Sequence, residues 1–328
     1  MTRLLKVLGP DDPAIREAAA ILVAGGLVAF PTETVYGLGA DGLNPEAVAR
    51  IYAAKGRPTT NPVILHVDGV ASALPLVSHW PTAAQALADR FWPGPLTLVL
   101  PASAAVPAIV RAGGLSVALR CPDHAIALAL IRAAGRPLAA PSANRSQHLS
   151  PTRAEHVASS LGDGVDLILD GGPTAAGLES TILDLSGNQP RILRPGPIGP
   201  ADLAEMLGPV ELWEGAVPAG EMQAAPGMAE RHYSPRAQLE LVARGEGLRE
   251  ADGRVAYVGL GALPPLPKGV RGILLPLDAA LVGTRFYALL HELDDAGFER
   301  VVMERPPEDE AWLALRDRLR RAASKETP

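Results

Sequence analysis

The sequence predicts a two-domain α/β protein, and three observations support this prediction. Short apolar runs typical of strands alternate with helix-like segments over the first two-thirds of the chain, which is the pattern of a layered α/β domain. Residues 209–235 then show no sustained period and are rich in Pro, Gly and Ala, as expected of a long connector. A shorter alternation of strands and helices follows. We therefore expect a larger domain at 1–208, a linker at 209–236 and a smaller domain at 237–328.

The first domain should contain a twisted, mixed sheet with helices on both faces. Residues 11–26 begin with Asp and Pro and end with two glycines, which are common boundaries of a helix. Residues 44–56 repeat this order with Asn, Pro and Gly. Three more helices are expected, at 82–91, 124–135 and 152–161. The short apolar runs predict buried strands at 27–30, 62–67, 96–100, 115–120, 137–140, 166–170 and 180–185.

The second domain should be a smaller, Rossmann-like α/β unit. Two amphipathic patterns predict long helices at 279–297 and 308–322, because their apolar residues recur with a helical period. Apolar runs predict the strands of this domain at 238–242, 254–259, 271–276 and 299–304.

The composition argues against several classes of protein. No apolar stretch reaches the roughly 18 residues of a membrane span, and the first residues lack the apolar core of a secretory signal. We therefore expect a cytoplasmic protein. Cys121 is the only cysteine, which excludes an internal disulfide and a cysteine-based metal cluster. We expect no metal bound by protein side chains alone.

The charge is spread evenly along the chain. The formal net charge is −6, and residues 1–210 carry 15 basic and 17 acidic side chains, which leaves 15 and 19 for the remainder. Neither part is a polycation, so we expect no extended nucleic-acid surface and no attraction to anionic lipid. A local basic pocket for a nucleotide remains compatible with these numbers.

The segment 31–66 holds the densest group of side chains suited to binding or catalysis. It reads PTETVYGLGADG, then a short helix, then KGRPTTNPVILHV, and its polar residues fall in loops that begin or end strands. Such loops carry the binding groups of many α/β proteins. The segment therefore predicts a site for a small anionic ligand. Its candidate residues are Thr32, Glu33, Thr34, Lys55, Arg57, Asn61 and His66.

The glycines of this segment match a dinucleotide-binding pattern only in spacing. Gly37, Gly39 and Gly42 form G-x-G-x-x-G, but PTETVY separates them from the preceding strand, whereas the first glycine of a dinucleotide site follows its strand directly. We therefore interpret them as tight-turn glycines. The sequence has no P-loop motif, so a bound phosphate would need separate cations. The candidates are Lys55, Arg57 and Arg194.

Two basic residues at strand ends allow two interpretations each. His66 lies in an otherwise apolar strand and could be either a satisfied core residue or a ligand contact. Arg120 ends another strand, where a structural salt bridge and a clamp for a ligand carboxylate fit equally well. For Cys121, no dedicated base is evident nearby, so a buried thiol is favoured over a nucleophile.

Hydroxyl groups gather near two later strands. Ser142 and Asn144 lie in PSANRSQHLSPT, and Ser180 begins STILDL; helix capping cannot account for all three, so we interpret them as donors around one pocket. The polar residues 231–234 at the end of the connector would suit a segment that folds over a ligand. No Ser-His-Asp spacing or G-x-S-x-G elbow occurs, which argues against a hydrolase that forms a covalent intermediate.

Eight motifs in this order resemble those of the threonylcarbamoyl-AMP synthase family in its longer, two-domain form. They are PTETVYGLGADG, KGRPTTNP with a following His, FWPGPLTLVL, VALRCPDH, PSANRSQHLSPT, GLESTILDL, ILRPGP and HYSP. The resemblance covers about residues 10–235, and the second domain fits only in length and α/β character. It implies that L-threonine, bicarbonate or CO2, and ATP are condensed to threonylcarbamoyl-AMP and pyrophosphate, the first stage of making threonylcarbamoyladenosine in tRNA.

The resemblance also implies roles for single residues. L-Threonine would be held by Thr34, His66, Arg120, Ser180 and the backbone of Ala140. ATP, accompanied by Mg2+, would be held by Arg57, Asn61, Ser116, Ser142, Ser150, Arg194 and Tyr233. Lys55 and Arg57 would offset charge on the phosphates during catalysis, without a covalent enzyme intermediate. Gln147 stands where many relatives have Gly, which affects the loop that carries Ser150.

Two other functions remain compatible with the sequence. One is a regulatory module that binds a nucleotide or RNA without turnover, and the other is a dinucleotide-dependent oxidoreductase suggested by the glycine run. For the synthase, the expected partners are ATP, L-threonine and bicarbonate, followed by the tRNA threonylcarbamoyltransferase machinery that would receive the product.

Overall fold

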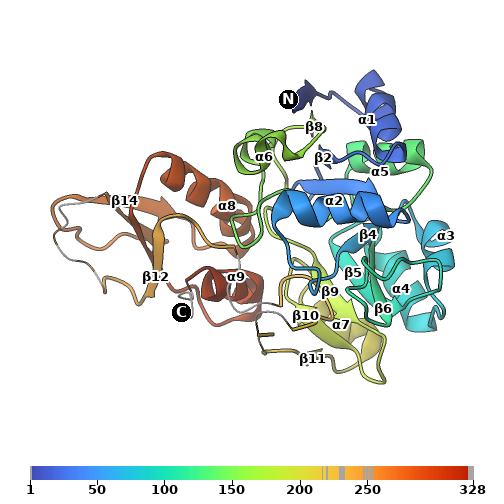
Figure 1. Ribbon diagram of the computed structural model, residues 1–328. Helices are drawn as coiled ribbons and strands as arrows, with labels where there is room; N and C mark the ends of the chain where they lie inside the picture. The colour runs from blue at the N-terminus through green and yellow to red at the C-terminus, as the bar shows by residue number, and fades with distance from the viewer. Residues whose placement is uncertain are drawn as a thin grey trace.

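The chain folds into two α/β units, each built on its own sheet (Figure 1). The computed structural model describes residues 2–215, 217–218, 221–228, 233–246, 248, 250 and 254–323. Across these ranges, no helix is both long and apolar enough to cross a membrane.

The large sheet is mixed, as the sequence predicts. Its spatial order is β1, β8, β2, β3, β7, β4, β6, β5, β9, β10, β11. Both parallel pairs, such as β4 with β6, and antiparallel pairs, such as β5 with β6, occur in it. The strands are β1 (Arg3–Lys6), β2 (Val28–Phe30), β3 (Gly37–Asp41), β4 (Ile64–His66), β5 (Leu96–Pro101), β6 (Ser116–Arg120), β7 (Leu138–Ala139), β8 (Leu167–Asp170), β9 (Thr181–Asp184), β10 (Arg191–Arg194) and β11 (Glu211–Leu212).

Helices cover both faces of this sheet. Val28 and Phe30 of β2 pack in one apolar cluster with α1 (Pro13–Val23) and α5 (Ala125–Ala134). Ala29 points to the opposite face and joins the cluster built by four other helices, because side chains alternate along a strand. These helices are α2 (Pro45–Lys55), α4 (Thr82–Phe91), α6 (Ala154–Leu161) and α7 (Pro200–Leu207). The short elements α3 (Val70–Ala73), η1 (Leu74–Leu76) and η2 (Gly162–Gly164) complete this unit.

The described parts of the connector cover the rest of the α1 and α5 face. Ala225 and Met228 are buried against Ile64, Ala118 and other strand residues, and Trp213 and Val217 pack beside them. The connector therefore takes the place that a helix would occupy on this part of the sheet.

The tight-turn interpretation was wrong for Gly37 and Gly39 and right for Gly42, which lies in the turn that the Asn44 amide closes on the Asp41 carbonyl. Gly37 and Gly39 lie within β3, and none of the three has a positive φ. A Cβ on Gly39 would stand 2.7 Å from the ring of Phe30 on the neighbouring strand. These residues allow two buried strands to approach closely, and they do not open a helix as a dinucleotide site requires.

The small sheet is entirely parallel, in the order β12 (Gln238–Val242), β15 (Arg300–Glu304), β13 (Val255–Leu260), β14 (Val270–Leu275). Both helices, α8 (Ala279–Asp295) and α9 (Leu313–Ala323), pack in one apolar cluster on one face, with η3 (Glu310–Trp312) preceding α9. Leu248 and Leu266 pack on the other face. The unit is α/β as predicted, but the Rossmann-like detail is not confirmed, because a doubly wound sheet carries helices on both faces.

Helices α8 and α9 also join the two units. They lie between the small sheet and the larger domain (Figure 1). Val35, Leu149 and Leu178 of the larger domain belong to the same apolar cluster as Phe286 and Leu315. The second unit therefore shares a buried core with the first.

Candidate active site

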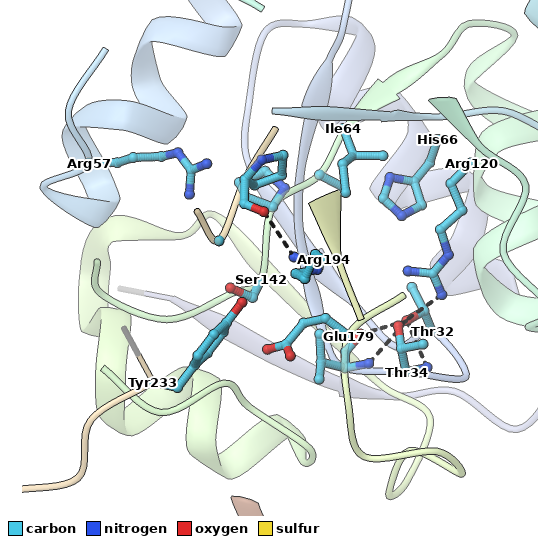
Figure 2. Close-up of a pocket in the computed structure, with 16 residues that line it drawn as sticks. Thr32, Thr34, Arg57, Ile64, His66, Arg120, Ser142, Glu179, Arg194 and Tyr233 are labelled. Carbon is cyan, nitrogen blue, oxygen red and sulfur yellow. Dashed lines mark hydrogen bonds between the residues drawn. The ribbon is translucent and has the colours of Figure 1, made fainter. Parts of the chain in front are cut away.

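A narrow cavity lies where strand ends of the large sheet meet the connector (Figure 2). Its volume is about 40 Å³, which is room for roughly three water molecules. It is lined by Thr32, Thr34, Val35, Gly37, Arg57, Ile64, His66, Arg120, Ala140, Pro141, Ser142, Glu179, Arg194, Pro226, Gly227 and Tyr233.

One end of the cavity is built by Arg120 and the loop before β3. His66 and Arg120 end the paired strands β4 and β6 in register, so both side chains reach the same edge. Arg120 Nη2 donates to Thr34 Oγ1 at 2.8 Å and lies 2.7 Å from Glu33 Oε1. A salt bridge therefore exists, and Arg120 nevertheless lines the cavity, so it could also reach a ligand carboxylate.

His66 is a neutral imidazole in this cavity. Burial lowers its pKa to about 3, with a further contribution from the Arg120 charge. Its Nδ1 is buried and has no hydrogen-bond partner among the described residues. Because a buried polar atom normally has a partner, the free nitrogen on the cavity wall favours ligand contact over a satisfied core histidine.

The opposite end contains Arg57, which follows helix α2. Asn44 caps the start of this helix, and Gly56 ends it in the left-handed conformation. Arg57 Nε then donates to the carbonyl of Asn61 at 3.0 Å, and Nη2 donates to its side-chain oxygen at 2.5 Å. Burial lowers the pKa of Arg57 to about 10, so it remains a cation at neutral pH. Asn61 orients Arg57 and does not itself line the cavity.

Lys55 is turned away from the cavity. It is buried, and its Nζ donates to the carbonyls of Ser142 and Asn144. Burial, followed by the Arg57 charge, holds its pKa well below the usual range. In this conformation Lys55 fixes the turn that presents Ser142, and its contact with phosphates stays a prediction.

Arg194 connects the last strands to the connector. Its Nε donates to the carbonyl of Ser180 at 3.1 Å and its Nη2 to Ser180 Oγ at 3.1 Å. Ser180 Oγ also lies 2.8 Å from Thr97 Oγ1. Gly227 crosses directly above, where a Cβ would stand 2.6 Å from the hydroxyl of Tyr233. The connector can approach this closely because residue 227 has no side chain.

Tyr233 is buried with a positive φ of 64°, a conformation uncommon outside glycine. Such backbone strain is often found at functional sites. The neighbouring Arg231 and His232 lie outside the described residues. The expectation that residues 231–234 fold over a ligand therefore concerns only Tyr233 and Ser234 in the described part of the chain.

Three other expected residues do not line the cavity. Ser116 is partly exposed at the start of β6, and Ser180 is held behind Arg194. Ser150 is buried and donates from Oγ to Glu179 Oε1. Gln147 adopts a positive φ of 70°, a conformation that glycine adopts more readily.

Glu179 is a cavity residue that sequence reasoning missed. It is buried, and both its oxygens accept hydrogen bonds. Burial alone would raise its pKa, but the charges of Arg318 and Arg194 outweigh burial and lower it. The sequence signal was an acid directly before a buried strand, whose partners lie in the second domain and could not be deduced from spacing.

The fold and the cavity together define a two-unit α/β protein with a cationic pocket for small anionic ligands. The family described as Telomere recombination matches residues 20–196, and the family described as Threonylcarbamoyl-AMP synthase, C-terminal domain, matches residues 198–324. The chain belongs to the threonylcarbamoyl-AMP synthase family, in its two-domain form.

Two relatives illustrate the similarity. The chain is 40% identical to Threonylcarbamoyl-AMP synthase of Bacillus subtilis, with 96% of this chain and 94% of that protein covered. It is 36% identical to the protein in the crystal structure of P. abyssi Sua5 complexed with L-threonine. The superposition covers 98% of each chain, with a TM-score of 0.89. Both likenesses extend over the two units.

Proposed function

We propose that this protein condenses L-threonine, bicarbonate or CO2, and ATP to threonylcarbamoyl-AMP and pyrophosphate. Family membership and relatives named for this activity support the proposal. The structure of the P. abyssi relative complexed with L-threonine supports threonine as a substrate.

The observation that carries the proposal is the chemical difference between the two ends of the cavity. Arg120, Thr34 and the neutral His66 form one end, which suits the carboxylate, ammonium and hydroxyl groups of an amino acid. Arg57 and Arg194 lie at the other end, where guanidinium groups suit phosphate oxygens. A zwitterionic amino acid and an anionic nucleotide would therefore meet in one cavity.

The reaction needs positioning more than it needs a nucleophile of the protein. The ammonium group of threonine first releases a proton to water. The free amine then bonds to the carbon of CO2 and releases a second proton to water, which gives a carbamate. A carbamate oxygen then bonds to the α-phosphorus of ATP as the bond to pyrophosphate breaks. Arg57 and Arg194 would stabilise the negative charge that leaves with pyrophosphate, and the buried walls would protect the carbamate from water.

The cavity must widen before it can hold both substrates. Its volume of about 40 Å³ is far below the roughly 300–1,000 Å³ of typical ligand pockets. The connector residues Pro226, Gly227 and Tyr233 form part of its wall and, unlike the strands, belong to no regular element. We infer that they move outward to admit ATP and close over it.

Magnesium would enter with ATP as part of the substrate. The described residues contain no group of three or more His, Cys, Asp and Glu that could hold a metal ion. Phosphate oxygens and water would then supply most of its ligands, as is common for Mg2+. The ion would offset phosphate charge beside Arg57 and Arg194. We further propose that the protein acts in the cytoplasm and passes its product to the tRNA threonylcarbamoyltransferase machinery.

Pyrophosphate release tests the proposal directly. The purified chain with ATP and Mg2+ should release pyrophosphate only when L-threonine and bicarbonate are both present, and AMP-linked threonylcarbamate should be detected by mass spectrometry. Omission of either co-substrate is the control. No release with all three substrates would refute the proposal.

The two alternative functions have no support in the comparisons. The relatives named above are synthases, and two of the three glycines behind the oxidoreductase interpretation, Gly37 and Gly39, lie inside strand β3.

A further inference from the structure

Arg318 of helix α9 connects the second unit to the cavity. It is fully buried, although it belongs to a helix outside the large sheet. Its Nε donates to Glu179 Oε2 at 2.7 Å, and its Nη2 donates to the carbonyl of Pro195 at 3.0 Å. Its guanidinium also lies 5.0 Å from the ring centroid of Tyr233. One side chain therefore contacts three segments that surround the cavity.

Glu179, the carboxylate that Arg318 contacts, lines the pocket (Figure 2). Its Oε1 accepts from Ser150 Oγ and, at 3.1 Å, from the hydroxyl of Tyr287 on α8. Its Oε2 accepts from Arg318. Two of its three donor residues come from the second unit, so the orientation of this cavity carboxylate depends on α8 and α9.

Arg318 also flanks the Arg194 contact with Ser180. Glu179 directly precedes Ser180, and Pro195 directly follows Arg194. Arg318 donates to Glu179 and to the carbonyl of Pro195, and Arg194 donates to the carbonyl of Ser180. The two arginines thus hold the start of β9 and the end of β10 together from one side.

We propose that Arg318 is a positioning residue for the ATP end of the pocket, and that the second unit influences the reaction through it. This inference rests on the proposed function. Arg318 would keep Ser150 and Tyr233 in place through Glu179 and direct ring contact. It would also balance the Glu179 charge, which would otherwise face a triphosphate.

Stability alone is a poor explanation for this contact. A buried ion pair loses so much hydration that its net stabilisation is small or absent. An arginine that served only to join the two units would not need to contact a carboxylate on the cavity wall. Its consequence should therefore appear in substrate binding as well as in unfolding.

The test compares Arg318→Met and Arg318→Lys with a matched control in the full-length chain. Arg244→Met is the control. Like Arg318, Arg244 pairs with a buried glutamate that also accepts a hydrogen bond from a tyrosine, here Glu304 and Tyr257. Unlike Glu179, Glu304 does not line the cavity. Arg318→Met should raise the KM for ATP about tenfold or more, as loss of a charged hydrogen bond allows. Arg318→Lys should recover part of this loss, and Arg244→Met should leave the KM unchanged.

A double variant separates positioning from folding. Arg318→Met alone leaves Glu179 charged and buried, which is destabilising, so it could simply fail to fold. Glu179→Gln/Arg318→Met removes both charges and should return the unfolding temperature towards that of the unmodified chain. The KM for ATP should stay several-fold raised, because Tyr233 still lacks its contact with Arg318. Full recovery of the KM in this variant would overturn the proposal.

Hydrogen exchange without substrates separates this inference from the proposed function. Amides in peptides that contain Ser180 or Tyr233 should exchange faster in Arg318→Met than in Arg244→Met. Unchanged exchange would refute the positioning role even if the chain is an active synthase. Faster exchange in a chain that makes no threonylcarbamoyl-AMP would leave the positioning role supported and refute only the proposed function.

Discussion

At the residue scale, Arg120 fits both interpretations that the sequence left open, a structural salt bridge and a clamp for a ligand carboxylate. It is paired with Glu33 and Thr34, yet it lines the cavity. Both observations fit one role, because the guanidinium has five donors in a planar fork and can hold two acceptors at once. Glu33 and Thr34 would then hold Arg120 at the angle that a substrate carboxylate needs.

Replacement of Arg120 tests this role. Arg120→Ala should raise the KM for L-threonine about a hundredfold, the effect expected when a buried charged hydrogen-bond pair loses one partner, while the dissociation constant for ATP stays nearly unchanged. Steady-state kinetics and calorimetric titration with ATP measure the two effects. The expected split follows from the position of Arg120 at the end of the cavity away from Arg57.

Two further variants control for folding. Arg136→Ala removes an arginine that pairs with the buried Asp41 at the edge of the same sheet, and it should alter neither constant. Glu33→Gln added to Arg120→Ala should relieve the unpaired Glu33 charge without restoring threonine binding. Equal loss of threonine and ATP binding in Arg120→Ala would contradict the clamp.

Single residues also show the limits of sequence reasoning. Arg57 and Arg194 were identified as cations suited to phosphate, and His66 and Arg120 as basic residues in or at the end of apolar strands; all four line the cavity. Lys55 was expected at the phosphates but bonds to two carbonyls. A sequence shows that a lysine ends a helix near a candidate site, but it shows neither its burial nor which acceptors compete for its three donors.

At the element scale, helices α6 and α8 meet through two stacked histidines. The ring centroids of His156 and His291 are 3.8 Å apart, and the ring planes differ by 19°. The backbone amide of Thr152 donates to His156 Nδ1, and His291 Nε2 lies 3.1 Å from the carbonyl of Ser150. The accepting Nδ1 shows that the His156 imidazole is neutral, and the stacked pair joins the second unit to the loop that carries Ser150.

Acid should weaken this junction. Burial lowers the pKa of His156 to about 3, with added contributions from His291 and Arg153, and burial lowers the pKa of His291 as well, partly offset by the Ser150 carbonyl, Asp294 and Asp295. In the unfolded chain a histidine titrates near 6.5. Between pH 6.5 and 3 the unfolded state thus binds more protons, so the free energy of unfolding falls as the pH drops.

Urea unfolding at several pH values between 7.5 and 4.5 measures this effect. His156→Gln should lose stability less steeply below pH 6.5 than the unmodified chain, by at most about 1.4 kcal/mol per pH unit, the limit for one proton. His79→Gln, which changes an exposed histidine outside the junction, should keep the original slope. A slope unaffected by His156→Gln would show that the junction does not titrate as expected.

Elements were predicted best where composition and period agreed. The helices α1, α2 and α5 carry helix-ending glycines and apolar periods, and the structure has them near the expected bounds. Strand β3 was missed because its three-residue core, GLG, has no strand propensity; its pairing with β2 and β7 stabilises it instead. The placement of both helices on one face of the small sheet was beyond sequence reasoning, because periodicity does not tell which face a helix covers.

At the scale of the whole molecule, the connector is held at both ends by different units. Its first part packs on the large sheet through Trp213, Ala225 and Met228. Its last part is held by the second unit, where Ser234 Oγ donates to the carbonyl of Ala322 and Arg236 pairs with Asp294 and Asp295. A wall of the cavity is therefore fixed partly by residues that lie far along the chain.

Two truncations test whether the connector can act without the second unit. A chain that ends at Glu214 retains β11 and lacks the rest of the connector, whereas a chain that ends at Arg236 retains the whole connector and lacks α8 and α9. Both should fold, because the two apolar clusters that α1, α2 and α5 build on the large sheet contain no residue beyond position 212. Val35, Leu149 and Leu178 would become exposed in both, so circular dichroism at low protein concentration is the appropriate check of folding.

The two truncated chains should bind ATP equally weakly. Tyr233 at the end of the longer chain would lack Arg318 and Tyr287, its ring contacts in the second unit, so retention of the connector should give no benefit. Calorimetric titration with a non-hydrolysable ATP analogue compares both with the full chain. Threonine binding should be affected less, because Arg120, Thr34 and His66 lie entirely in the first unit. Binding of ATP by the chain that ends at Arg236 as tightly as by the full chain would show that the connector closes the pocket unaided.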